Sequence, residues 1–322
     1  MKRIFLILSF FLLSLKSFCW GFFAHKKINH YAVFLLPPEM MVLYKSNIAF
    51  LTDHATDADK RKGMIKNEGG KHFIDIDHYG SYPYKDLPRR WKEAVQVYTE
   101  DTLKKYGIVP WAIENVLFNL TNSFKEKDLK KILKYSADLG HYVGDAHVPL
   151  HTNTNHNGQL TDQVGIHGFW ESRIPELLAD KEFNFYIGGA QYISNTHQYI
   201  WDRILESAAA ADSVLFLEKE LSSQFSSFTK YSYEKRNKKL VKQYSSSYTK
   251  AYHLKLNKMV ERRMQQAIFT LASFWLTAWV NAGQPDLKDL SLKKLTPEEQ
   301  KEFEKLDSSW KKNNFGGTDI CQ

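Results

Sequence analysis

Histidine and carboxylate residues are concentrated in two short segments of this sequence. The first contains His141, Asp145 and His151, and the second contains His167 and Glu171. In each segment an imidazole and a carboxylate are four residues apart, which places them on one face of a helix, one turn from each other. Imidazole and carboxylate groups are ligands of zinc. Two such pairs and the additional His151 predict more than one metal ion, and therefore a hydrolase.

A helix is expected to carry the first of these segments. Asp128 is a typical N-cap, apolar residues follow it at helical spacing, and Pro149 ends the helix and turns His151 toward a neighbouring position. His147 is a candidate for orienting the carboxylate of Asp145. The first ligand segment is therefore predicted to lie at the C-terminal end of one long helix.

Helical periodicity continues through most of the chain. Further helices are expected at 92–106, 202–220 and 264–280, and the aromatic stripe of the last one is expected to pack in the core. Residues 72–77 alternate between polar and apolar types and are predicted to form a short strand or an extended loop. Residues 230–258, rich in Lys, Tyr and Ser, are interpreted as helices with polar faces or as a mobile excursion.

The composition favours one all-α domain, a single compact multi-helix unit. The chain has 322 residues, of which 43% are hydrophobic, and this is enough for a sizeable core and excludes global disorder. No linker divides the body, so the domain is expected to span 20–283, with a polar, peripheral tail at 284–322. The two cysteines, Cys19 and Cys321, predict a fold held by its core or by metals and not by disulfides.

The first nineteen residues have the pattern of a Sec signal peptide. Lys2 and Arg3 precede a short apolar run at 4–15, which is too short to span a membrane. Cleavage is expected before Trp20, so the protein is predicted to be periplasmic or extracellular; a lipoprotein acylated at Cys19 is the alternative. Removal of 1–19 would lower the formal charge from +8 to +5. This excess suits an anionic substrate, although the basic residues are spread over many helical faces.

The order of these residues resembles the zinc-dependent phospholipase C superfamily, which includes the single-strand-specific zinc nucleases of fungi and plants. The likeness runs from Trp20 to Glu171. It consists of a Trp at a processed N-terminus, a histidine five residues later, an Asp, a His-Phe-x-Asp, a His-x3-Asp-x3-Pro-x-His and a final His-x3-Glu. A weaker likeness extends to the helix at 267–283. The resemblance implies an all-α domain of the zinc phospholipase C and zinc nuclease type.

The resemblance also implies three zinc ions, each with its own set of ligands. The first set is Asp57, His72, His141 and Asp145. The second set is the amine and carbonyl of Trp20, with His25 and with Asp145 as a bridge. The third set is His151, His167 and Glu171. Asp59 is the alternative to Asp57, and Asp57 and Asp145 are the predicted catalytic residues.

The chemistry of such a centre is hydrolysis of a phosphodiester. A carboxylate-bridged pair of metal ions lowers the pKa of a shared water and gives hydroxide, the expected nucleophile, at neutral pH. A third ion neutralises the oxygen of the leaving group. Because an α-amine is a ligand only when it is free, cleavage before Trp20 would complete the site.

Different features of the sequence favour different substrates. Glu171 as the last ligand and the lack of disulfides resemble the phospholipase branch, so the first hypothesis is a secreted phospholipase C-like enzyme that contacts a membrane surface. The choline pocket of that branch is not matched at Phe23, Ala58 and Gly69. Phe73 and Asp75 resemble residues with which the nucleases bind a nucleobase, although Phe73 could equally be a core residue.

A nuclease or nucleotidase acting on single-stranded nucleic acid is therefore the alternative to the phospholipase hypothesis. A third interpretation, a zinc-stabilised binding protein, fits less well because three adjacent ions exceed what stability requires. No obligate protein partner is expected.

Overall fold

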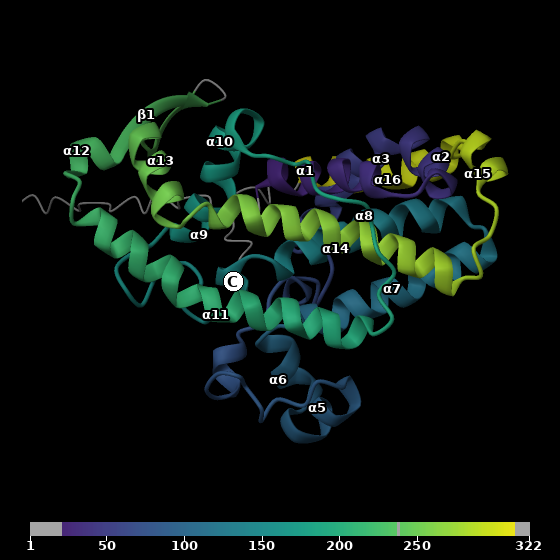
Figure 1. Ribbon diagram of the computed structural model, residues 1–322, viewed down its shortest axis with the longest axis horizontal. Coiled ribbons are helices and arrows are strands. Elements are labelled where there is room, and N and C mark those ends of the chain that lie inside the picture. Colours follow the sequence, from purple (N-terminus) through teal and green to yellow (C-terminus); the bar gives the residue numbers. More distant parts are fainter. Residues whose placement is uncertain (1–20, 237–238, 313–322) are drawn as a thin grey trace, which may run out of the picture.

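Long helices form the body of the protein. The computed structural model describes residues 21–236 and 239–312. Its long helices are α1 (Phe22–Ala32), α7 (Val109–Glu126), α8 (Leu129–Ala146), α11 (Thr196–Ser222) and α14 (Met259–Asn281). In Figure 1, α7, α8, α11 and α14 run along the long axis of the molecule. The helices α1, α7 and α14 all pack against α8, which places α8 at the centre of the fold.

Other elements connect and cover these helices. The remaining α-helices are α2 (Pro38–Ser46), α3 (Ile48–Asp53), α4 (Asp57–Arg61), α5 (Trp91–Tyr98), α6 (Glu100–Lys105), α9 (Ile166–Gly168), α10 (Ile174–Glu182), α12 (Ser227–Lys230), α13 (Ser246–Lys255), α15 (Lys288–Leu292) and α16 (Pro297–Lys312). The 3₁₀ turns are η1 (Val33–Leu35), η2 (His54–Thr56), η3 (Gly69–Lys71), η4 (Ile76–Tyr79) and η5 (Pro149–Thr152), and η6 (Phe169–Arg173) is a π-helical turn. The strands β1 (Tyr231–Arg236) and β2 (Lys239–Tyr244) form an antiparallel hairpin.

The predicted central helix is confirmed, with its cap. Asp128 Oδ1 accepts a hydrogen bond from the backbone N of Lys131, and α8 begins at Leu129, directly after Asp128. The helix ends at Ala146, and Pro149 begins the 3₁₀ turn η5 that carries His151. The local signals of cap and proline therefore set both ends of the element that bears the first ligand segment.

A glycine lets α1 approach α8 closely. A β-carbon at Gly140 would lie 1.8 Å from Oδ1 of Asn29, so no larger residue fits at this crossing. Asn29 in turn donates to the carbonyl of Ala137 on α8 and to that of Leu51 on α3. These contacts lock α1 against α8 just beside the residues that could bind metal.

The core confirms the role expected of the aromatic stripe on α14. Leu271 and Trp275 are fully buried, and Trp275 Nε1 donates to the carbonyl of Ser136 on α8. A second apolar cluster surrounds Phe169 and Tyr252 beneath α13. Within the described residues, no helix combines the length and the apolar character needed to cross a membrane.

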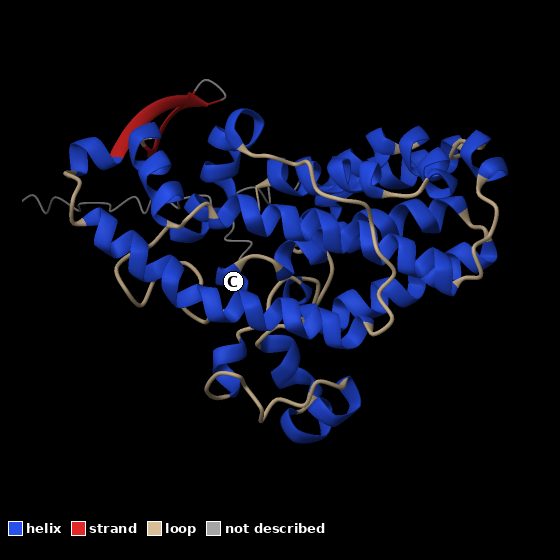
Figure 2. Ribbon diagram, viewed as in Figure 1, coloured by secondary structure: helices blue, strands red, loops and turns tan. Residues whose placement is uncertain are grey.

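Three segments differ from the expectations, and a fourth agrees with one of two alternatives. The predicted helix at 92–106 is two helices, because Thr99 adopts a positive φ of 66° between α5 and α6. Residues 72–77, predicted as a short strand or an extended loop, form a loop and part of η4. Residues 230–258 contain the hairpin shown in red in Figure 2, followed by α13. The polar tail forms α15 and α16, and α16 packs along α4.

Candidate metal centre

The first cluster of ligand groups lies where α4, α8 and the loop after η3 meet. His72 Nδ1 is 2.9 Å from His141 Nε2 and 2.9 Å from Asp145 Oδ2. The fourth member is Asp59, whose Oδ1 lies 3.4 Å from His141 Nε2 and 3.7 Å from His72 Nδ1. All four side chains are buried. His141 is oriented by its other nitrogen, which lies 2.8 Å from the carbonyl of Ala55.

Asp57, the residue expected in this cluster, is held elsewhere. Its carboxylate pairs with His54 Nδ1 at 2.7 Å and with Lys60 Nζ at 2.9 Å. The structure thus brings the alternative residue, Asp59, to His72 and His141. The physical reason is the helical path of α4, in which residues two apart point in opposed directions.

The second cluster shares two residues with the first. His25 of α1 stacks on His141, with ring centroids 3.8 Å apart, and its Nε2 lies 3.5 Å from Asp145 Oδ1. A β-carbon at Gly144 would lie only 3.0 Å from His25 Nδ1, so this glycine makes room for the ring. Trp20, the other predicted ligand here, lies outside the described residues. Asp145 therefore faces both clusters, one with each carboxylate oxygen.

The third cluster joins His151 of η5, His167 of α9 and Glu171 of η6. The Nε2 atoms of the two histidines are 2.9 Å apart, and Glu171 Oε2 lies 3.1 Å from His167 Nε2 and 3.3 Å from His151 Nε2. The backbone fixes this cluster to the first one, because His151 Nδ1 lies 2.8 Å from the carbonyl of His72. In addition, His151 Nδ1 is 3.4 Å from Asp145 Oδ1.

The donor atoms of all three clusters fit a metal ion. In two of the clusters a pair of imidazole nitrogens lies 2.9 Å apart, a separation at which the two rings share a proton or face a common metal ion. His25 Nε2 and Asp145 Oδ1 are enclosed and have no hydrogen-bond partner in the described part of the chain. Each of the three groups has its ligand atoms within 4.8 Å of one another. Buried His and carboxylate groups at this spacing fit three zinc ions.

The electrostatics of the site agree with this assignment. Burial, and then Lys62, lower the pKa of both His72 and His167 to about 3, which keeps the imidazoles in the neutral form that binds metal. Burial opposes a charge on His141, yet Asp59 and Asp145 raise the pKa of His141 to about 10. The carboxylates of Asp59 and Asp145 thus favour a positive charge between them, on His141 or on a metal ion.

Comparison with known protein families identifies the type of site. A family model described as S1/P1 Nuclease matches residues 38–281, which is more than half of the chain. The chain belongs to the S1/P1 nuclease family. It is a zinc-dependent phosphodiester hydrolase, and its three buried clusters are those expected of an S1/P1 nuclease. No curated protein matches the chain significantly.

Membership in the S1/P1 nuclease family bears on the choice of substrate. It favours the alternative hypothesis, a nuclease, over the phospholipase C-like enzyme that the sequence put first. The match includes the described ligand residues except His25, which precedes it, and it ends before α15 and α16. Glu171 in place of Asp is therefore compatible with a nuclease, and Cys19 and Cys321 both lie outside the described residues.

Lys62 is a site residue that sequence reasoning missed. Its Nζ lies 2.9 Å from Asp59 Oδ1, and its side chain is only 5% exposed. Burial opposes ionisation of Asp59, but Lys62 and then His141 outweigh it and hold the pKa of Asp59 well below its usual range. The signal in the sequence was the spacing of three residues from Asp59, which puts both side chains on one face of the chain.

The predicted base-binding residues lie in the loop after His72. Phe73 is half-buried, and the loop is tied to the third cluster because the backbone N of Ile74 donates to the carbonyl of His151. Burial, and then Asp77, raise the pKa of Asp75 to about 7. The loop thus places an aromatic ring and a carboxyl group of near-neutral pKa next to the metal ligands in sequence.

His147 does not have the orienting contact that was expected. Its Nδ1 lies 2.8 Å from the carbonyl of Val143 and its Nε2 lies 3.4 Å from Oγ1 of Thr270. Burial, and then Arg263, lower its pKa well below the usual value, so the ring is neutral. His147 serves the packing of α8 against α14.

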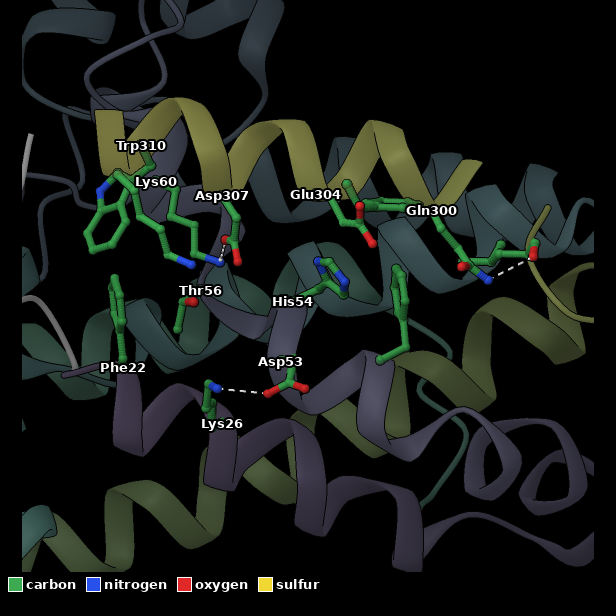
Figure 3. A pocket seen from close by; sticks show the side chains of 14 residues that line it. Phe22, Lys26, Asp53, His54, Thr56, Lys60, Gln300, Glu304, Asp307 and Trp310 are labelled. Atoms are coloured by element: carbon green, nitrogen blue, oxygen red, sulfur yellow. Dashed lines mark hydrogen bonds and ion pairs between the residues drawn. The ribbon is translucent and has the colours of Figure 1, made fainter. Parts of the chain in front are cut away.

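The C-terminal helix encloses a cavity beside α4. Asp307 of α16 pairs with Lys60, which also holds Asp57, and the rings of Phe22 and Trp310 are 5.6 Å apart. Figure 3 shows Phe22, Lys60, Asp307 and Trp310 around a cavity of about 460 Å³. The tail that the sequence indicated to be peripheral therefore contacts the element that carries Asp59.

Proposed function

We propose that this protein hydrolyses the phosphodiester bonds of single-stranded nucleic acid. The proposal is based on the position of the loop that carries Phe73 and Asp75. Hydrogen bonds of His151 to the backbone of His72 and Ile74 connect this loop to the three buried His and carboxylate clusters. Membership in the S1/P1 nuclease family supports the same substrate class. Zinc, when bound, acts as a Lewis acid toward the phosphodiester and toward the attacking water.

The residues of the chain have distinct tasks in this reaction. Asp145 holds the first two clusters together, since its two oxygens face His72 and His25 separately. Asp59 completes the first cluster and fixes the ammonium group of Lys62 at its edge. Lys62 then donates to a phosphoryl oxygen whose negative charge grows in the transition state, and its burial makes that charge more effective.

A nucleobase next to the scissile phosphate is bound by the loop after His72. Phe73 offers an aromatic surface on which a base of any type can stack. Asp75 offers a hydrogen-bonding carboxyl group, and its raised pKa lets it act as a donor below about pH 7 and as an acceptor above. These two side chains favour an unpaired base, because a base within a duplex is already stacked and paired.

We further propose that the protein is exported and that removal of 1–19 frees the amine of Trp20. Among the described residues, the second cluster consists of three ligand groups, those of His25, His141 and Asp145. The free amine of Trp20 would add a fourth ligand to this cluster. The enzyme would then be inactive until it leaves the cytoplasm.

The test compares substrates on one zinc-loaded preparation of the mature protein. We expect rapid hydrolysis of single-stranded DNA and RNA, much slower hydrolysis of duplex DNA, and no release of diacylglycerol from phosphatidylcholine. The variant Asp145→Asn should lose the activity while keeping the helical fold, which excludes a contaminating nuclease. Release of diacylglycerol without cleavage of nucleic acid would overturn the proposal in favour of the phospholipase.

A further inference from the structure

The β-hairpin is attached directly to the turn that carries Glu171. Arg173, two residues after Glu171, donates to Oε2 of Glu234 in β1 at 2.9 Å and to the carbonyl of Tyr244 in β2 at 3.1 Å. The guanidinium is almost fully buried, with its side chain 6% exposed. Each strand of the hairpin is thus tied to the third cluster of metal ligands by one buried side chain.

Aromatic stacking makes the base of the hairpin rigid. Phe169 of η6 stacks on Tyr244 with centroids 3.8 Å apart, and it also stacks on Tyr252 of α13. Tyr231 pairs with Tyr244 across the two strands. The position of the hairpin relative to Glu171 is therefore set by packing as well as by hydrogen bonds.

The outer face of the hairpin is mostly exposed, although Lys242 Nζ lies 3.9 Å from the ring centroid of Tyr231. In the observed register Tyr233 lies opposite Lys242, and Lys235 lies opposite Leu240, so all four side chains share one face. Tyr233 is 69% exposed, Leu240 is 71% exposed, and both lysines are exposed. Figure 1 shows the hairpin at one end of the molecule, where it projects from the helical body.

The charge of the hairpin is strongly positive. Its two strands contain four Lys and Arg residues against the single acid Glu234, and that acid is neutralised by Arg173. An exposed surface that alternates lysine with an aromatic ring matches the sugar-phosphate backbone and the unstacked bases of a single strand.

We propose that the outer face of the hairpin, formed by Tyr233, Lys235, Leu240 and Lys242, binds single-stranded polynucleotide beyond the nucleotides held at the metal centre. This inference rests on the proposed nuclease function. A strand leaving the third cluster would meet an arm roughly 20 Å long, from the rise of a six-residue strand. The arm would raise the affinity for long substrates and leave the chemical step unchanged.

The experiment compares a long oligodeoxythymidylate with a dinucleotide, using the zinc-loaded mature enzyme. The variants are Lys235→Gln with Lys242→Gln, and Tyr233→Ala. The matched control is Lys45→Gln with Lys288→Gln, two exposed lysines on α2 and α15 at the opposite end of the molecule. Circular dichroism and zinc content verify that every variant is folded.

We expect the arm variants to raise KM for the oligonucleotide about 10-fold, with kcat unchanged. The slope of log KM against log salt should fall by about 1.4 for the double lysine variant, since each neutralised phosphate of a single strand contributes about 0.7. Hydrolysis of the dinucleotide should change less than about two-fold, because it does not reach the arm. The control variant should behave as the wild type does.

Three results would contradict the proposal that the hairpin binds single-stranded polynucleotide. The first is an unchanged KM and salt slope, and the second is an equal loss on both substrates, which would indicate that the hairpin only supports Glu171. The third is lysine-dependent binding to vesicles of phosphatidylglycerol without binding to the oligonucleotide.

Failure of the proposed function itself would look different. The wild-type enzyme would then cleave neither nucleic-acid substrate. The arm would still be tested in that case, by fluorescence anisotropy with a phosphorothioate oligonucleotide and the same variants.

Discussion

Substitution of Asp59 and of Asp57 separates two ligand assignments that differ by two positions in the chain. Asp59→Asn removes the charge of a carboxylate that lies 3.4 Å from His141 Nε2 and 2.9 Å from Lys62 Nζ. Asp57→Asn removes a carboxylate that contacts His54 and Lys60. We expect the first variant to bind two zinc ions and the second to bind three.

The expected magnitudes follow from these contacts. A site filled at a zinc concentration about 1,000 times its dissociation constant stabilises the fold by about 4 kcal/mol. Its loss in Asp59→Asn should lower Tm by about 8 °C, at ~2 °C per kcal/mol for a chain of this size. Activity should fall at least ~100-fold, as a metal ligand matters more than the groups behind it. Asp57→Asn should cost only about 1–3 kcal/mol, because Lys60 keeps its partner Asp307.

Elemental analysis of the two purified variants, together with thermal melts and turnover of single-stranded DNA, provides the measurement. The stability loss alone does not decide the question, because both variants break buried ion pairs. The zinc content does. If Asp57→Asn contained two zinc ions and Asp59→Asn three, the geometric assignment would be refuted and the spacing argument from the sequence would stand.

Three further predictions use other parts of the site. Lys62→Met should lower kcat about 100-fold with all three zinc ions retained, and unchanged kcat would exclude a role at the phosphate. Asp75→Asn should melt at a higher temperature than the wild type, by a margin that grows as pH rises from 5 to 8. The raised pKa of about 7 means that folded wild-type protein binds a proton which the unfolded chain has lost above about pH 4, so the stability of the wild type falls by ~3 kcal/mol between pH 5 and pH 7. A gain that is equal at both pH values would contradict this. One additional residue before Trp20 should reduce the zinc content by one ion and abolish turnover while the fold persists; equal zinc and turnover in both forms would show that the amine is not a ligand.

Those parts of the site that depend on local geometry could be predicted from the sequence. The i,i+4 pairs His141 with Asp145 and His167 with Glu171 share one face because the helical repeat dictates it. The cap at Asp128 likewise places the N-terminus of α8. These features need no knowledge of the rest of the fold.

Features that depend on the direction of a side chain could not be predicted. Asp57 and Asp59 are about 200° apart around a helix, and nothing local says which of them faces α8. Lys62 is informative only once Asp59 is known to face the site. The hairpin at 231–244 was missed because Lys and Ser residues are mixed with its Tyr, Leu and Val residues, so the alternation of apolar residues that marks a half-buried strand is weak.

The clusters also explain why the fold and the metal centre depend on each other. Neutral imidazoles and charged carboxylates occupy the junction of α1, α4 and α8, where a protein of this size would otherwise place apolar side chains. Such groups destabilise a core unless a cation satisfies them. Gly140 and Gly144 bring α1 close enough to α8 for His25 to reach Asp145, and each glycine lowers helix stability by about 1 kcal/mol relative to alanine. The two glycines and the buried polar groups therefore lower the stability of the protein without metal, and we expect the binding of zinc to compensate for this loss.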